Sequence, residues 1–175
     1  MKLSSRLAAA TATGLVAGLW SGAGIARDGQ HDFDFNVGVW HTHIKRIKDA
    51  LSGGTHSIEL EGTVTVRKVW GGRAELEEIE TDGPEGHWEG LTLFLYNPKA
   101  EQWSQSFINS RSGELGAPLI GEFKEGHGEL FSQDTLGGRS ILVRGVWSVA
   151  SADAHSYEES YSADGGKSWA PASRG

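Results

Sequence analysis

Closely spaced histidines mark the stretch of this sequence with the most obvious chemical potential. His41 and His43 lie two residues apart in HDFDFNVGVWHTHIK, residues 31–45, so they would share one face of an extended strand. A zinc site needs three or four ligands, and no other histidine or carboxylate stands at a typical motif spacing from this pair. The pattern favours solvated histidines outside a barrel, and we predict no metal and no cofactor.

Nucleophilic and phosphate-binding motifs give no better candidate. The sequence has no cysteine and no G-x-S-x-G motif. The glycine pairs at 71–72, 137–138 and 165–166 do not open helical segments, as phosphate-binding loops do. We therefore predict no catalytic residue from a motif.

Polar side chains that share a strand face with aromatic ones form a more informative pattern. In SYEESYS, residues 156–162, Glu159 alternates onto the face of two tyrosines, and in RAELEEIE, residues 73–80, Glu78 shares the face of Ala74 and Leu76. Such faces, if they point inward, would give an apolar pocket with a few oriented polar groups, as small-molecule sites have. A shift of one residue in register would turn them outward. The predicted ligand-binding residues are Trp88, Trp103, Gln105, Phe107, Asn109, Glu78, Glu159 and Arg46.

The elements that carry these residues read almost entirely as strands. Residues 58–67 alternate apolar or small residues with polar ones, and eight further segments have a strand-like pattern between short turns that often contain glycine. Consecutive strands joined by tight turns favour an up-and-down barrel over a sandwich, whose crossings need longer loops. We predict a single all-β, antiparallel barrel domain, with Phe33 and Phe35 packed as a plug.

Composition narrows the possible partners. The 175 residues carry a formal charge of −7 and include 25 glycines. No basic tract is present, which argues against nucleic acid and against an anionic membrane surface as partners.

Residues 1–26 differ from the rest of the sequence. Lys2 and Arg6 precede an uncharged stretch that ends in Ala-Gly-Ile-Ala, with Gly24 and Ala26 as small residues before a cleavage site. We predict a signal peptide at 1–26, a barrel domain at 27–175, and a periplasmic or secreted protein. An uncleaved membrane anchor is the alternative.

The opening stretch and several later segments resemble known sequences. Gly38-Val39-Trp40 is similar to the G-x-W element that opens lipocalin-type barrels. The chain also resembles exported bacterial proteins related to the DUF1579 family. The matching segments, within residues 32–169, are DFDFNVGVW, EGTVTVRKVWGGRAELEE, EGLTLFLYNPKAEQWSQSF, GEFKEGHGELF, GRSILVRGVW and YSADGGKSW. This resemblance implies a lipocalin-like barrel and no particular activity.

The C-terminal residues depart from that pattern. After the DGGKSW turn only APASRG remains, and its proline and final glycine are not typical of a strand. The sequence therefore predicts that the closing strand is missing or aberrant, with residues 157–162 left as an open edge.

Three functions follow from these observations. The first is an exported barrel that binds a small, partly apolar ligand without catalysis. The second is an isomerase or hydrolase that uses Glu78 or Glu159 as a general base. The third is an interaction protein that pairs through the open edge, so that the chain is either a monomer or an edge-paired dimer. The aromatic faces without a catalytic motif favour the first.

Overall fold

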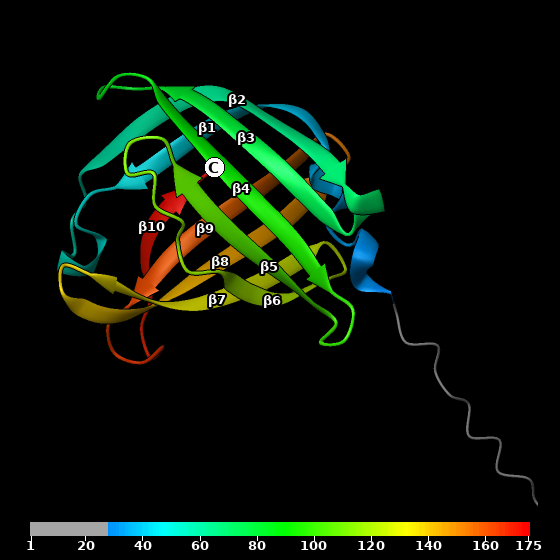
Figure 1. Ribbon diagram of the computed structural model, residues 1–175. Helices are drawn as coiled ribbons and strands as arrows, with labels where there is room; N and C mark the ends of the chain where they lie inside the picture. The colour runs from blue at the N-terminus through cyan, green and yellow to red at the C-terminus, as the bar shows by residue number, and fades with distance from the viewer. Residues whose placement is uncertain (1–27) are drawn as a thin grey trace, which may run out of the picture.

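The barrel predicted from the sequence is present. A computed structural model describes residues 28–175, and the predicted leader lies outside them. Ten antiparallel strands follow one another around a closed barrel, and the last pairs with the first (Figure 1). The strands are β1 (Gly38–Ile47), β2 (Ser57–Val69), β3 (Ala74–Asp82), β4 (Trp88–Asn97), β5 (Gln102–Asn109), β6 (Leu119–Lys124), β7 (His127–Leu136), β8 (Arg139–Ser151), β9 (Ala154–Ser162) and β10 (Ala170–Arg174).

Strand β2 shows how alternating apolar and polar residues form one strand of the barrel wall. Leu60 and Val66 are buried, whereas Glu59, Glu61 and Arg67 between or beside them are exposed. This alternation lets one face of the strand contribute to the interior while the other remains in water. The expected phase of this strand is therefore confirmed.

The C-terminal strand corrects one prediction. β10 pairs with β9 along most of its length and with β1 at two positions, Lys45↔Arg174 and Arg46↔Ser173. Pro171 is tolerated because the register shifts between Pro171 and Ser173, and prolines in sheets are found at such irregularities. The expectation of a missing closing strand is wrong, and the predicted edge at 157–162 has a strand on each side.

The N-terminal segment closes one end of the barrel. Two short 3₁₀ turns, η1 (Gly29–His31) and η2 (Asp34–Asn36), place the fully buried Phe33 against a cluster of rings. The ring centroids of Phe94 and Trp103 lie 5.1 and 5.0 Å from that of Phe33, and Phe35 stacks on Phe123 at 4.9 Å. The predicted plug is confirmed, and it fills this end with apolar side chains.

Two further 3₁₀ turns, η3 (Ala50–Ser52) and η4 (Trp70–Gly72), lie between strands. Within residues 28–175, no helix is long and apolar enough to cross a membrane.

Candidate functional site

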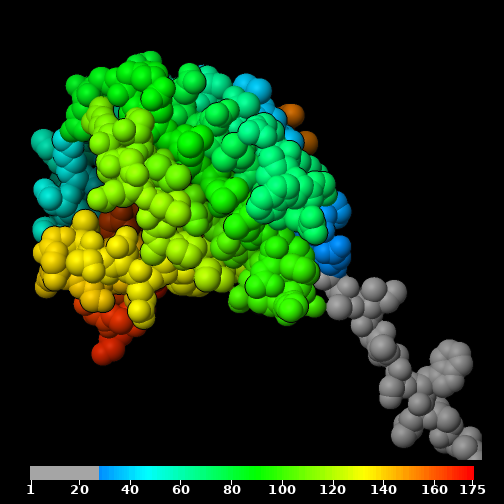
Figure 2. All heavy atoms as spheres, viewed as in Figure 1, coloured from blue at the N-terminus to red at the C-terminus, as the bar shows by residue number. Residues whose placement is uncertain are grey.

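The end of the barrel opposite the plug is hollow. A cavity of about 550 Å³ occupies this part of the interior, which is within the usual size range of small-molecule sites. Figure 2 shows the opening between the cyan, yellow-green and yellow segments, with the C-terminal red segment visible inside it. The aromatic residues of the cavity wall are Trp40, Trp88, Phe107, Trp147, Tyr157 and Tyr161.

Glu159 is the centre of one polar group in the wall. The Tyr161 hydroxyl donates a hydrogen bond to Glu159 Oε1 at 2.7 Å, and the Tyr157 hydroxyl donates to Oε2 at 3.4 Å. All three side chains come from β9, where residues two apart share the inward face. We call Tyr157, Glu159 and Tyr161 the tyrosine–glutamate cluster.

Two further side chains support this cluster, Trp147 from the neighbouring strand β8 and Gln105 from β5. The Trp147 indole nitrogen donates to Gln105 Oε1 at 3.0 Å. The pKa of Tyr157 lies well above its ordinary value, chiefly because of burial and also because of the charge of Glu159, while a hydrogen bond with Gln105 acts in the opposite direction. Burial also raises the pKa of Tyr161. Both phenols therefore keep their protons and remain donors.

A second polar group surrounds Glu77 on β3. Thr92 Oγ1 donates to Glu77 Oε1 at 2.6 Å, and Asn36 Nδ2 donates to Oε2 at 3.4 Å. Burial raises the pKa of Glu77, and the two hydrogen bonds partly oppose this effect. All three residues lie in the cavity wall, so a second carboxyl group faces the interior.

A third acidic side chain lies on the inward face of the same strand. Glu75 is fully buried, and neither carboxyl oxygen has a hydrogen-bond partner in the described part of the chain. Burial and the nearby Asp34 raise its pKa to about 8, against a smaller opposing effect of Lys68. Lys68 instead pairs with Asp34 at 2.6 Å, so Glu75 has neither a hydrogen bond nor an ion pair within residues 28–175.

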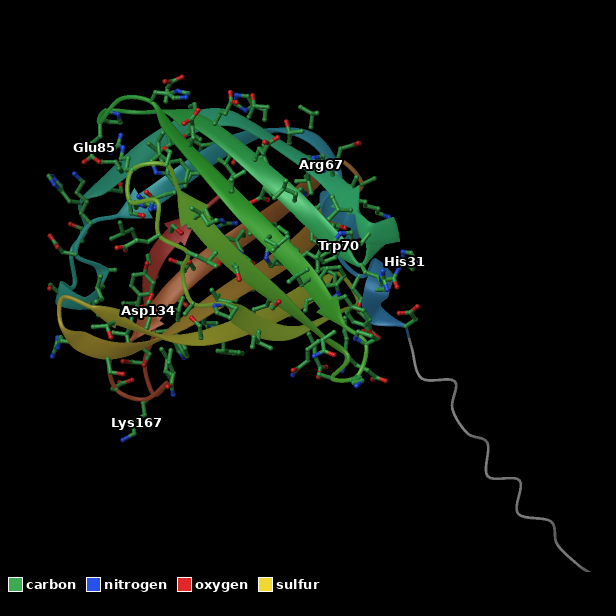
Figure 3. The ribbon with its side chains drawn as sticks, in the orientation of Figure 1. His31, Arg67, Trp70, Glu85, Asp134 and Lys167 are labelled. Atoms are coloured by element: carbon green, nitrogen blue, oxygen red, sulfur yellow. The ribbon has the colours of Figure 1, made fainter. Side chains whose placement is uncertain are left out.

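The mouth of the cavity carries a cation over an aromatic ring. The guanidinium carbon of Arg46 is 5.8 Å from the ring centroid of Trp88, and Phe107 stacks on Trp88 at 5.8 Å. Figure 3 shows Asp134 near this end of the barrel and His31 at the plugged end. Both Asp134 and Arg46 are exposed members of the cavity wall.

Between β1 and β9 the barrel is closed by a short strand pairing. Strand β10 pairs with β1 only at Lys45 and Arg46. Beyond these paired positions, the ring of Trp40 on β1 packs edge-on against His155 on β9, with centroids 4.4 Å apart. Burial lowers the pKa of His155, so this side of the wall is sealed by ring packing between neutral groups.

Five of the predicted site residues do lie in the cavity wall. They are Arg46, Trp88, Gln105, Phe107 and Glu159, which come from four different strands. The closed barrel brings them to one space although they span 114 positions of the sequence, from 46 to 159.

Three predicted site residues lie elsewhere. Glu78 is exposed on the outside of β3, one position out of phase with the inward Glu77. Trp103 belongs to the plug, where it is 1% exposed and its indole nitrogen donates to the Gly29 carbonyl at 2.8 Å. Asn109 caps a turn, because its side-chain oxygen accepts from the backbone N–H groups of Arg111 and Ser112.

The sequence did not identify Asn36, Glu77 and Thr92 as a group. Thr92 lies opposite Glu77 in the pairing of β3 with β4, but the apolar residues Ala74 and Leu76 suggested the opposite phase for β3. Glu75 and Glu77, which lie two positions apart and so share one strand face, were the signal in the sequence that could have indicated a polar inward face.

The histidines of β1 lie where the alternation placed them. His41 and His43 are exposed, and both are within 4 Å of carboxylates on β2: His43 Nε2 is 3.1 Å from Glu59, and His41 Nε2 is 3.7 Å from Glu61. Among residues 28–175, no group of three or more histidine, aspartate or glutamate side chains is arranged to hold a metal ion.

Comparison with known protein families finds no matching family, and comparison with characterised proteins finds no match either. The geometry of the cavity is therefore the basis for the functional argument.

Proposed function

We propose that this chain is an exported binding protein that holds a small, partly apolar molecule inside the barrel and performs no catalysis. The observation that carries the proposal is the cavity of about 550 Å³, with six aromatic side chains and two polar groups in its wall. Small-molecule sites combine apolar walls with a few oriented polar groups in this way. The signal-like pattern of residues 1–26 supports a periplasmic or secreted location.

In this proposal the plug closes one end of the barrel, and the polar groups orient the bound molecule. The rings around Phe33 fill one end and exclude water from it. The tyrosine–glutamate cluster and the Glu77 group then offer fixed hydrogen-bonding positions in the remaining space. An apolar molecule with a polar end would bury its rings against Trp88 and Phe107, gaining about 25 cal/mol for each Å² removed from water.

A neutral fluorescent probe, N-phenyl-1-naphthylamine, tests the proposal. We expect saturable one-to-one binding to the purified chain, measured as a rise in probe fluorescence. Val64→Phe should abolish or strongly weaken it, because Val64 lines the cavity. Thr63→Phe is the matched control, since Thr63 is exposed on the outer face of the same strand. Binding that is absent, or that survives Val64→Phe unchanged, would contradict the proposal.

A catalytic role for Glu159 is the second candidate. The observation that favours it is a carboxylate in a cavity, flanked by two phenols, which is an arrangement suited to acid–base chemistry. Glu78 drops out of this alternative because it faces solvent. A turnover that Glu159→Gln abolishes, with probe binding intact, would favour an enzyme.

A further inference from the structure

The hydrogen-bond donors around Glu159 are already in use. Both tyrosine hydroxyls of the tyrosine–glutamate cluster donate to its carboxylate, and the Trp147 indole donates to Gln105 Oε1. A phenol has one O–H to give and an indole has one N–H. None of these three groups can donate to a bound molecule without losing its present bond.

Acceptor capacity remains on the carboxylate itself. Each carboxylate oxygen has about two lone-pair sites, and each Glu159 oxygen receives one bond from a tyrosine. Glu159 is only partly exposed and lines the cavity. The free lone pairs therefore favour a ligand group that donates hydrogen bonds.

Arg46, the cationic side chain of the cavity wall, forms no ion pair with this carboxylate within residues 28–175. Arg46 and Glu159 both face the interior and are separated by one strand, since each pairs with Ser173 of β10. Yet the guanidinium of Arg46 lies over Trp88, and no ion pair joins it to Glu159 in residues 28–175. A half-buried carboxylate without a cationic partner has an affinity for a positive charge.

The aromatic surroundings suit the same kind of ligand. Tyr157 and Tyr161 flank Glu159, and the ring of Trp147 is 4.8 Å from that of Tyr157. The faces of aromatic rings attract cations. The net charge of −7 also favours the approach of a positive molecule.

We infer that the ligand is an organic amine: an apolar, ring-bearing molecule whose protonated primary or secondary amine binds Glu159 between the two tyrosines. The ammonium would donate to the free lone pairs of the carboxylate, and the apolar part would extend toward Trp88 and Phe107 at the mouth. This inference rests on the proposed binding function, because it names the class of ligand for the same cavity.

Displacement of N-phenyl-1-naphthylamine by three matched competitors tests the inference. The competitors are 2-(2-naphthyl)ethylamine, 2-(2-naphthyl)ethanol and 2-naphthylacetate, which share a ring and differ in the polar end. We expect the amine to displace the probe at about one tenth or less of the alcohol concentration, because the ammonium adds an attraction between opposite charges that the neutral alcohol lacks. The carboxylate should be the weakest.

The variant Glu159→Gln should bring the amine to the level of the alcohol, and it should weaken the alcohol much less than the amine. Glu158→Gln is the control, because Glu158 is exposed on the outside of the same strand and pairs with Arg174 at 3.2 Å. It removes the same charge without touching the cavity, so it should preserve the amine preference.

The outcomes separate this inference from the proposed function. If the probe binds in the cavity but the alcohol or the carboxylate competes as well as the amine, the inference fails and the binding function stands. An amine preference that survives Glu159→Gln also overturns it. If the probe does not bind the unmodified chain, the proposed function itself fails. The competitor ranking uses the unmodified chain, so it does not depend on whether a variant folds.

Discussion

At the scale of single residues, Glu75 should make the stability of the barrel depend on pH. Its pKa is about 8 in the folded chain, whereas the ordinary value of a glutamate, which we take for the unfolded chain, is 4.5. Between these two values the folded chain keeps the proton and the unfolded chain loses it. The contribution of Glu75 to stability is therefore greatest below this window and falls by about 1.4 kcal/mol for each pH unit as pH rises through it.

Glu75→Gln should remove this effect of Glu75, since an uncharged amide has no proton to lose. We expect the variant to be more stable than the original chain at pH 8 by a few kcal/mol, with a smaller difference at pH 5. Urea unfolding at both values measures this. Glu77, whose pKa is also raised by burial, leaves some pH dependence in place. Glu80→Gln, on the exposed face of β3, should keep the original dependence, and an equal slope in Glu75→Gln would contradict the argument.

At the scale of elements, the strands were predictable and the phase of one of them was not. Alternation located nine of the ten strands, and it gave the correct inward face for β1, β5 and β9. It failed on β3 because the rule places apolar residues inside, whereas this interior has a polar wall. Glu75 and Glu77 face inward there, and Glu78 faces water. A one-residue difference in phase exchanges every side chain between the two faces.

The closing strand was missed for a different reason. Its five residues include Pro171, and a proline in so short a segment argues against a strand. Its pairing depends on β9 and β1, which are distant in sequence, and local pattern does not report such contacts. The position of Trp103 likewise follows from the N-terminal segment folding over the barrel end, where the Gly29 carbonyl accepts its indole proton.

A glycine on β6 sets how closely two strands approach. A Cβ at Gly121 would lie 1.9 Å from the carbonyl oxygen of Glu129 on β7, too close for any side chain. Gly121→Ala must therefore separate β6 from β7, and we expect it to destabilise the fold by about 2–3 kcal/mol. Ile120→Ala, at an exposed neighbouring position, should cost about 1 kcal/mol or less. Thermal unfolding of the two variants measures the difference, and equal losses would refute the close-approach argument.

At the scale of the whole molecule, the barrel is filled at one end and hollow at the other. The rings of Phe33, Phe94, Trp103 and Trp147 form one cluster with the plug. Toward the mouth, the cavity wall holds the polar side chains of Glu159 and Thr92 as well as the rings of Trp88 and Phe107, and the space between them is open. The core that stabilises the fold and the cavity that would hold a ligand are thus adjacent parts of one interior, and they share Trp147.

Because strands from all sides line the cavity, an occupant should stabilise the barrel as a unit. At a concentration of N-phenyl-1-naphthylamine one hundred times its Kd, binding adds about 2.7 kcal/mol to the free energy of unfolding. For a domain of this size, that corresponds to a rise in Tm of about 5–10 °C. Calorimetry would measure the rise, and Val64→Phe should lose it. Hydrogen exchange should slow together in β3, β4 and β9, whose side chains meet across the cavity. Protection confined to the loops at the mouth would instead mean that the probe binds the surface, and the interior could not then be the binding site.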